Sequence, residues 1–356
     1  MGNDKVSVLL PVYNGARYLA QAIESILSQT HSNLELIVLD DRSTDQSVSI
    51  IEKYVALDPR IVFVRNETNL GLFANYNRCL EMSTGAYIKP FAQDDLLYPD
   101  YLIRAVAALD AHPSVSLVTT GRNHLGADNQ VLKVVSPWAK EALYSGRWLI
   151  IFSLILLSNS IGEPVVGLYR ADADKGSIAF DPRYYHYGDI ELWLRLLKKG
   201  EMYFLPDILC AFRVHDGATT NLNHRQMLDL LDAIRLGHQY FDYLAEIGES
   251  EEQFHKRVVE FAAMQVDHLV RERGLVASAV RAGGPAPGVG QPNNLQDDFA
   301  EAFLFALRYI TPTLAELDHL KRCREGDHVN FENEIKKIHS SLSWKVTAPL
   351  RAIRKL

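Results

Sequence analysis

The first element of the chain is an apolar run, Val6-Ser7-Val8-Leu9-Leu10, which Pro11 ends and after which the pattern turns helical from Ala16. In that helix, Leu19, Ile23 and Ile26 recur at the spacing of one face. The alternation continues and predicts strands over 6–10, 34–39, 61–64, 87–91 and 115–120, with helices from 16 and over 43–57, 72–82 and 100–111. Such alternation predicts βαβ units and a mostly parallel α/β sheet flanked by helices.

The rest of the chain divides by composition. The α/β domain is expected to cover 1–220, and a helical extension 221–335, with a Gly/Pro linker at 283–292 and a basic tail over 336–356. The longest uncharged stretch, Trp148 to Gly162, has 15 residues, fewer than the roughly 20 of a transmembrane helix. A buried helix is therefore predicted there rather than an interfacial one.

Composition excludes several classes of protein. With 356 residues, 47% hydrophobic and 23% charged, the chain is neither wholly disordered nor fibrous. The net charge of −7 argues against general binding of nucleic acid, which relies on basic surface. Three distant cysteines without CxxC spacing argue against a disulfide framework or a zinc site. They suit a reducing cytosol, and no secretory signal peptide is visible, so a cytoplasmic protein is expected.

Polar residues follow the carboxyl ends of four predicted strands, where open α/β sheets bind their ligands. The segments are Pro11-Val12-Tyr13-Asn14, Asp40-Asp41-Arg42-Ser43-Thr44-Asp45, Asn66 with Asn69-Leu70-Gly71, and Gln93-Asp94-Asp95. Carboxylates at such an edge suit a divalent cation that would neutralise a diphosphate. Asp40 could instead accept hydrogen bonds from a base or ribose, and Asp41, Ser43 and Asp45 could simply cap the following helix.

Two common nucleotide-binding motifs are missing from the sequence. There is no GxGxxG after the first strand and no GxxxxGK[ST] anywhere, which argues against a nicotinamide Rossmann site and a P-loop NTPase. A nucleotidyltransferase is also disfavoured, because Pro11-Val12-Tyr13-Asn14 is not a Gly-rich, basic loop.

In this order and spacing, the four segments resemble the family 2 glycosyltransferases, which have a GT-A fold and invert anomeric configuration. The resemblance covers about residues 5–220. It implies donor-binding roles for Pro11, Val12, Tyr13, Asn14, Asp40, Asn69, Gln93, Asp94, Arg213 and His215. Val12 and Tyr13 would border the base, Asp40 would contact it, and Asp94 would lie near the ribose or the donor sugar.

The resemblance also implies a metal site and carries two departures. Asp95 would be a ligand of Mg²⁺ or Mn²⁺, as the last carboxylate of the motif usually written DxD, whereas Gln93 stands at the first position. A QDD version accompanies Asn75-Tyr76-Asn77 in one branch of the family, and Tyr76 falls where many members have an arginine near the base. His215, in Arg213-Val214-His215, would contact the metal or the diphosphate.

A general base is implied by the segment Tyr187-Gly188-Asp189-Ile190-Glu191-Leu192-Trp193, which resembles the family's Glu-Asp pair before a Leu-Trp helix. Gly188 replaces the usual glutamate, and Asp189 would be the base. Asp189 and Trp193 share one helix face, whereas Glu191 points away. Asp189 could alternatively cap the helix. Glu163 could face the acceptor.

The resemblance implies a hexosyltransferase that moves a sugar from a nucleotide diphosphate-sugar to a glycan or lipid-linked acceptor. Residues 341–351 also resemble a tail found on bacterial surface-polysaccharide glycosyltransferases, which implies O-antigen or capsule assembly. The alternative is a non-catalytic sugar-nucleotide binding module. The tail has six basic residues and no acid, which leaves −13 on residues 1–335. It predicts either peripheral contact with the inner face of the plasma membrane or a helix packed on protein. The helical region could form a homo-oligomer.

Overall fold

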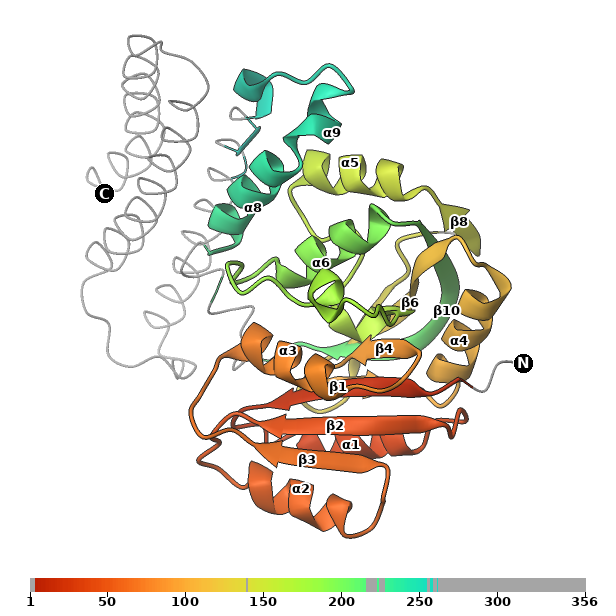
Figure 1. Cartoon of the computed structure of the whole chain (residues 1–356), viewed down its shortest axis with the longest axis vertical. Helices are drawn as coiled ribbons and strands as arrows, with labels where there is room; N and C mark the ends of the chain where they lie inside the picture. Colours follow the sequence, from red (N-terminus) through yellow and green to blue (C-terminus); the bar gives the residue numbers. More distant parts are fainter. Residues whose placement is uncertain are drawn as a thin grey trace, which may run out of the picture. The chain divides into compact units, whose positions relative to one another are not determined.

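The computed structural model describes residues 4–138, 140–215, 223, 228–254, 257, 258 and 261. The chain divides into two compact units, Met1–Ala218 and Thr219–Leu356. A ten-stranded sheet lies in the first unit, in the order β3-β2-β1-β4-β9-β6-β10-β5, with β7 beside β6 and β8 beside β10 (Figure 1). Its strands are β1 (Val6–Val12), β2 (Leu34–Asp40), β3 (Ile61–Arg65), β4 (Tyr87–Pro90), β5 (Leu96–Leu97), β6 (Val115–Leu125), β7 (Val131–Val135), β8 (Ala142–Tyr144), β9 (Leu168–Arg170) and β10 (Glu201–Arg213).

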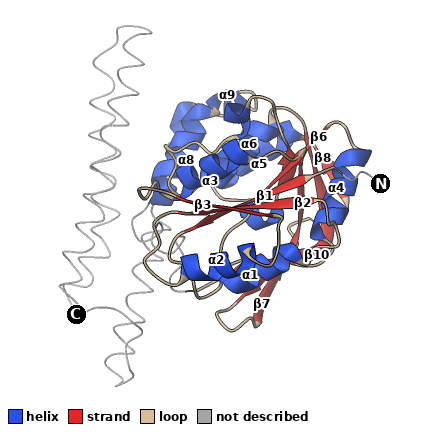
Figure 2. Cartoon of the chain, turned by 60° about the horizontal axis from the view of Figure 1, so that its bottom comes forward, coloured by secondary structure: helices blue, strands red, loops and turns tan. Residues whose placement is uncertain are grey.

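The helices of the first unit pack on both faces of this sheet. They are α1 (Leu19–Leu27), α2 (Ser47–Val55), α3 (Leu72–Met82), α4 (Tyr101–Ala111), α5 (Gly146–Leu156) and α6 (Gly188–Leu197), with short 3₁₀ turns η1 (Pro164–Val166) and η2 (Lys175–Ile178). Figure 2 shows α1 and α2 on one face of β1–β3, and α3 on the other. The predicted α/β sheet flanked by helices is therefore confirmed.

Strand direction divides the sheet into two parts. Strands β3, β2, β1 and β4 are mutually parallel, as predicted. Beyond β4 the sheet is mixed, because β9 runs antiparallel to both β4 and β6. The last strand, β10, has 13 residues and pairs in parallel with β6.

The first strand does not end at Pro11, contrary to the prediction. It continues to Val12, and Pro11 pairs opposite Leu39 of β2. Val12 directs its carbonyl oxygen toward the β2 side, where it accepts from the Asp41 N–H, so Pro11 faces the β4 side instead. The β4 ladder has already ended at Leu9. The missing proline N–H therefore costs no ladder hydrogen bond.

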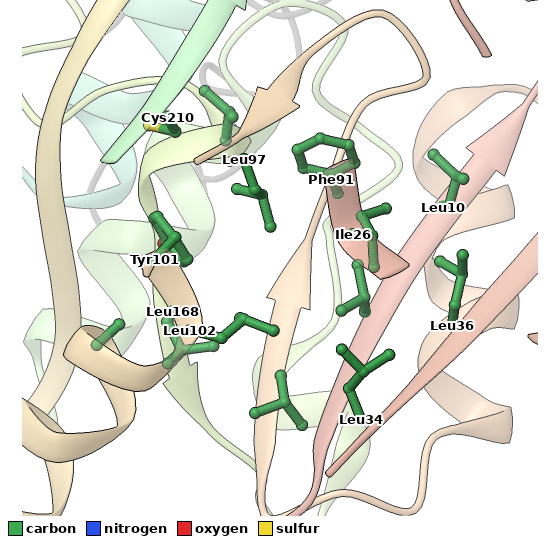
Figure 3. Close-up of a cluster of buried hydrophobic side chains, with 14 of the residues drawn as sticks. Leu10, Ile26, Leu34, Leu36, Phe91, Leu97, Tyr101, Leu102, Leu168 and Cys210 are labelled. Atoms are coloured by element: carbon green, nitrogen blue, oxygen red, sulfur yellow. The ribbon is translucent and has the colours of Figure 1, made fainter. Parts of the chain in front are cut away.

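The main hydrophobic core lies between the sheet and helices α1 and α4. It combines alternate residues of β1 and β2 with one face of each helix, as expected for amphipathic elements. Figure 3 shows part of this cluster, with Leu10, Leu36, Ile26, Phe91 and Tyr101. This packing fixes the strands whose carboxyl ends form the site described below.

Helix α5 covers most of the uncharged stretch but is buried on one side only. Leu149, Ile150 and Leu154 are buried, whereas Trp148, Ile155 and Leu156 are exposed. The predicted buried helix therefore forms, with one face buried and the other exposed. Within the described ranges, no helix combines the length and the hydrophobicity needed to span a bilayer.

The second unit is described mainly in α8 (Leu228–Gln239) and α9 (Phe241–Ala245), which bury residues such as Leu231 and Leu244. The predicted linker at 283–292 and the tail over 336–356 lie outside the described residues, and so does Cys323. Cys79 and Cys210 are buried free thiols.

Candidate functional site

The carboxyl ends of β1, β2 and β3 lie level at one edge of the sheet. Val12 is opposite Asp40, and Asp40 is opposite Arg65. The chain leaves each strand hydrogen-bonded to its neighbour, since the Asp41 N–H donates to the Val12 carbonyl at 2.7 Å and the Asn66 N–H to the Asp40 carbonyl at 2.8 Å. The predicted segments at the strand ends therefore meet along one rim.

The loops after β1 and β2 are joined by side-chain bonds. The Asn14 N–H donates to Ser43 Oγ at 2.9 Å, and Asn14 Oδ1 accepts from the Thr44 N–H at 2.8 Å. Asn14 has a left-handed backbone with φ of 49°, which an asparagine tolerates well. Asn14, predicted to bind donor, thus has its side chain committed to the loop.

Asp45 acts at the start of α2, as the capping interpretation expects. Its carboxylate accepts from the Ser47 N–H at 2.9 Å and from the Ala16 N–H at 3.0 Å. Burial raises the pKa of Asp45, but the hydrogen bonds from Ser47 and Ala16 outweigh it, so the pKa lies below its usual value.

The two acids after β2 have different surroundings. Asp40 is fully buried, forms an ion pair with Arg65 at 3.2 Å and accepts from the Ser43 N–H. The Asp41 carboxylate accepts from Asn66 Nδ2 and from the backbone N–H groups of Leu70 and Gly71, all within 2.9 Å. Asp41 therefore builds the loop before α3.

Asn69, predicted to bind donor, is part of the same loop. Its Nδ2 donates to the Asp41 carbonyl at 3.1 Å, and its Oδ1 accepts from the Gly71 N–H. Gly71 has φ of 83°, a conformation that favours glycine. The Asn69-Leu70-Gly71 motif is accounted for by this turn.

Gln93 connects the loops after β1 and β4. Its Oε1 accepts from the Tyr13 N–H at 3.0 Å, while its Nε2 donates to the Tyr13 carbonyl at 3.1 Å. A carboxylate at this position could accept but not donate, so the amide is chemically matched to its place. A Cβ on Gly15 would lie 2.2 Å from Gln93 Oε1. Gln93, the residue that departs from the DxD pattern, therefore holds the loop after β4 against the loop after β1.

Arg213 holds the two acids that follow Gln93. Its backbone N–H donates to Asp95 Oδ1 at 2.9 Å, and its Nε donates to the Asp94 carbonyl at 2.7 Å. The rest of the guanidinium donates to Asn129 Oδ1, the Gly126 carbonyl and Gln21 Oε1, and lies 4.3 Å from the centre of the Tyr18 ring. Arg213 is only 1% exposed, so its contacts are with protein.

The carboxylate of Asp94 is paired with the predicted histidine. His215 Nε2 lies 2.9 Å from Asp94 Oδ2, and the His215 ring packs 5.0 Å from that of Tyr18. The structure therefore brings Asp94, Asp95 and His215 into one cluster, with the histidine bound to Asp94.

Asp95 is the least satisfied carboxylate of the rim. It is 1% exposed, and its Oδ2 has no hydrogen-bond partner among the described residues. Burial, and then the charge of Asp94, raise the pKa of Asp95 well above its usual value. A buried oxygen without a donor fits a cation ligand. The described residues contain no group of three His, Cys, Asp or Glu side chains arranged to hold a metal, but Mg²⁺ often uses only one or two carboxylates with substrate phosphates and water.

Asp189 lies in the first turn of α6, one residue past its first position. The residue before the helix is Tyr187, so Asp189 is not the N-cap. Its Oδ2 accepts from Asn159 Nδ2 at 2.9 Å, and its Oδ1 from the Ile190 N–H at 2.8 Å. Glu191 is buried and forms an ion pair with Arg195 at 2.6 Å. It lies on another side of α6 than Asp189, as predicted.

An aromatic wall is formed by Tyr76 and Phe73 of α3 and Phe180 of the loop before α6. Tyr76 stacks on Phe180 with ring centres 4.7 Å apart, and Phe180 stacks on Phe73. Burial raises the pKa of Tyr76 well above 10, and the charge of Asp95 is the second cause of this rise. Asp94 and Asp189 act in the same direction. The Tyr76 phenol therefore stays neutral in the folded chain.

The same wall explains the second departure from the family pattern. A Cβ on Gly188 would lie 2.4 Å from Cζ of Phe73. The usual glutamate has no room at this position, because ring carbons occupy the space.

Two buried basic residues that no sequence motif marks, Lys89 and Arg122, hold the turn at 162–167. Lys89 is fully buried and donates to the carbonyls of Pro164, Val165 and Gly167 within 3.0 Å. Burial lowers the pKa of Lys89 to about 7. Glu163 forms an ion pair with Arg122 at 2.5 Å.

Comparisons with known proteins agree with this geometry. Residues 7–152 match the model of a family described as Glycosyl transferase family 2. An uncharacterized glycosyltransferase of Rickettsia typhi is 30% identical over 230 residues, which are 62% of this chain and 68% of that protein.

Two solved structures share the fold. Residues 1–349 of S. aureus TarS, in complex with UDP, align with a TM-score of 0.51 and 23% identity, over 71% of this chain and 68% of that one. The mannosyltransferase PcManGT from Pyrobaculum calidifontis, in complex with GDP-Man and Mn²⁺, aligns with a TM-score of 0.50 and 17% identity, over 87% and 83% of the two chains.

Proposed function

The chain belongs to glycosyltransferase family 2, and we propose that it is an inverting enzyme that uses a nucleotide diphosphate-sugar as donor. In the proposed reaction, an acceptor hydroxyl oxygen bonds to the anomeric carbon while the bond from that carbon to the diphosphate breaks. The hydroxyl proton passes to Asp189, and the nucleoside diphosphate leaves.

The observation that carries this proposal is the state of Asp95. An oxygen that is buried, unpaired and close to a second carboxylate is costly for folding unless a ligand uses it. It lies at the carboxyl edge of the parallel strands, where α/β sheets bind nucleotides.

Mg²⁺ or Mn²⁺ fits this oxygen, and the presence of Mn²⁺ in the PcManGT complex supports the choice. We assign the ion to Asp95, with His215 as the predicted second ligand. When bound, it would neutralise negative charge on the leaving diphosphate. His215 Nε2 is paired with Asp94, and a metal-ligating histidine commonly donates its other ring N–H to a carboxylate, so this pair is compatible with a role of His215 at the metal.

For the donor, we retain Pro11, Val12, Tyr13 and Asp40 around the base and Asp94 beside the ribose or sugar. Tyr13 is 49% exposed at the rim, which leaves its ring open to a planar base. Arg213, Asn14, Asn69 and Gln93 are assigned to shaping the loops, because their side chains bond to protein. Asp40 also bonds to protein, through Arg65 and Ser43, so its proposed contact with the base would add to these bonds. UDP in the TarS complex and GDP-Man in the PcManGT complex support a nucleoside diphosphate donor and do not distinguish uridine from guanosine.

Donor binding can be tested by thermal shift with UDP, GDP and their sugars, each with Mg²⁺, Mn²⁺ or a chelator. A donor at about 100 times its Kd should stabilise the chain by about 2.7 kcal/mol, and only with cation present. No stabilisation by any nucleotide would contradict the proposal. Stabilisation without donor hydrolysis or transfer would favour the non-catalytic binding module.

We further propose that the chain transfers a hexose to an acceptor in bacterial surface-polysaccharide assembly. The tail over 336–356 would touch the membrane beside a lipid-linked acceptor. The basic and apolar residues of the tail support this. Deleting 336–356 should abolish sedimentation with vesicles that contain anionic lipid. A chain that binds these vesicles equally well after deletion would favour packing on protein instead.

A further inference from the structure

We propose that Asn159 is a positioning residue that orients the carboxylate of Asp189 for proton transfer. This inference rests on the proposed function, in which Asp189 is the base. Asn159 lies 30 residues before Asp189 in the sequence, in the loop after α5, and its Nδ2 donates to Asp189 Oδ2 at 2.9 Å.

The direction of the Asn159 amide is fixed by its other end. Its Oδ1 accepts from the Gly162 N–H at 2.7 Å and from the Ile161 N–H at 3.2 Å. A flipped amide would direct NH₂ at two N–H donors, so the NH₂ group must face Asp189.

The loop that carries Asn159 is fastened to α6 and to the residue before it. The Tyr187 hydroxyl donates to the Leu157 carbonyl at 2.9 Å, and Trp193 Nε1 donates to the Gly162 carbonyl at 2.9 Å. Trp193 is fully buried. These bonds lie on either side of Asn159 in the sequence, so the amide and the carboxylate form one rigid unit.

This unit has two consequences for the base. The Asn159 amide donates to this carboxylate, and a neutral donor favours the charged form, which is the form that accepts a proton. The bond also restricts rotation of the carboxylate, whose Oδ1 accepts from the Ile190 N–H. On α3, burial raises the pKa of Tyr76, with a smaller contribution from the charge of Asp189, so this phenol stays neutral. Precise placement of a base is worth a large factor in rate.

The test compares Asn159→Ala and Asn159→Asp with the unchanged chain. Asn159→Ala removes the donor, so kcat should fall about 10-fold to 100-fold with little change in the donor KM, and the acid limb of kcat/KM should move to higher pH. Asn159→Asp should move that limb further, because it places a second carboxylate against Asp189. Gln29→Leu is the matched control: this buried amide bonds to Ser25, Tyr98 and Leu102, away from the acids. It should lower Tm and leave the pH profile unchanged.

A second measurement does not depend on turnover. The carboxyl ¹³C shift of Asp189, assigned with Asp189→Asn, should titrate at higher pH in Asn159→Ala than in the unchanged chain. Unchanged pH profiles and an unchanged titration, with only a lower Tm, would overturn the inference. If the unchanged chain transfers no sugar from any donor, the proposed function fails, while the titration still decides whether Asn159 acts on Asp189.

Discussion

Asp95→Asn is expected to abolish sugar transfer and at the same time to raise the melting temperature of the cation-free chain. Transfer should fall at least about 100-fold, because the neutral amide cannot hold a cation against the diphosphate. Stability should rise because the substitution removes a carboxylate that is buried with an unpaired oxygen. Each kcal/mol gained would raise Tm by about 2–4 °C in a domain of this size.

The stability gain should depend on pH. The pKa of Asp95 is raised in the folded chain, so above about pH 4 the unfolded chain releases a proton that the folded chain retains. The unchanged chain therefore loses stability as pH rises from that value toward the folded pKa. The Asp95→Asn chain has no carboxyl group to ionise at this position, so it does not lose this stability. Its Tm should exceed that of the unchanged chain at about pH 8 and equal it near pH 4. Melting curves at both pH values, in chelator, measure it.

Asp41→Asn is the matched control for this experiment. Asp41 is equally buried, but its carboxylate accepts three hydrogen bonds, one of them from Asn66 Nδ2. The NH₂ group of an asparagine at this position would face N–H donors. Asp41→Asn should therefore lower the free energy of unfolding by about 1–3 kcal/mol at neutral pH. If Asp95→Asn also lowers Tm at the higher pH, or keeps transfer, Asp95 is a structural acid rather than a cation ligand.

The location of the rim could be predicted from sequence, because strand–helix alternation alone places the carboxyl ends of parallel strands at one edge. The register that sets Val12, Asp40 and Arg65 level follows from that topology. The sequence does not show in the same way which of these side chains bond to other parts of the protein. Asn14 and Asn69 match donor-binding motifs, yet each bonds to a neighbouring loop.

What the sequence does not reveal are contacts between segments far apart along the chain. Gly188 departs from the family pattern because Phe73, more than 100 residues earlier, fills the space of a side chain. Gln93 departs because it bonds to the backbone of Tyr13. Asn159 gave no signal at all, since nothing in a single sequence links it to Asp189. Each of these depends on packing between elements rather than on local pattern.

Asp189→Asn is expected to lower kcat by about 10²–10⁴-fold while the chain stays folded and binds nucleotide and cation normally. The amide oxygen introduced by this substitution can still accept from Asn159 Nδ2, while the new NH₂ group replaces the oxygen that accepts from the Ile190 N–H, so a modest loss of Tm is expected beside the loss of the capacity to take a proton. Glu191→Gln is the control, because it neutralises an acid on the same helix that pairs with Arg195 instead. It should reduce Tm but keep transfer. Single-turnover rates measure transfer, and thermal shifts with donor measure binding. An Asp189→Asn chain that transfers sugar at the normal rate would exclude Asp189 as the base. One that no longer binds donor would place Asp189 in the binding of donor rather than in proton transfer.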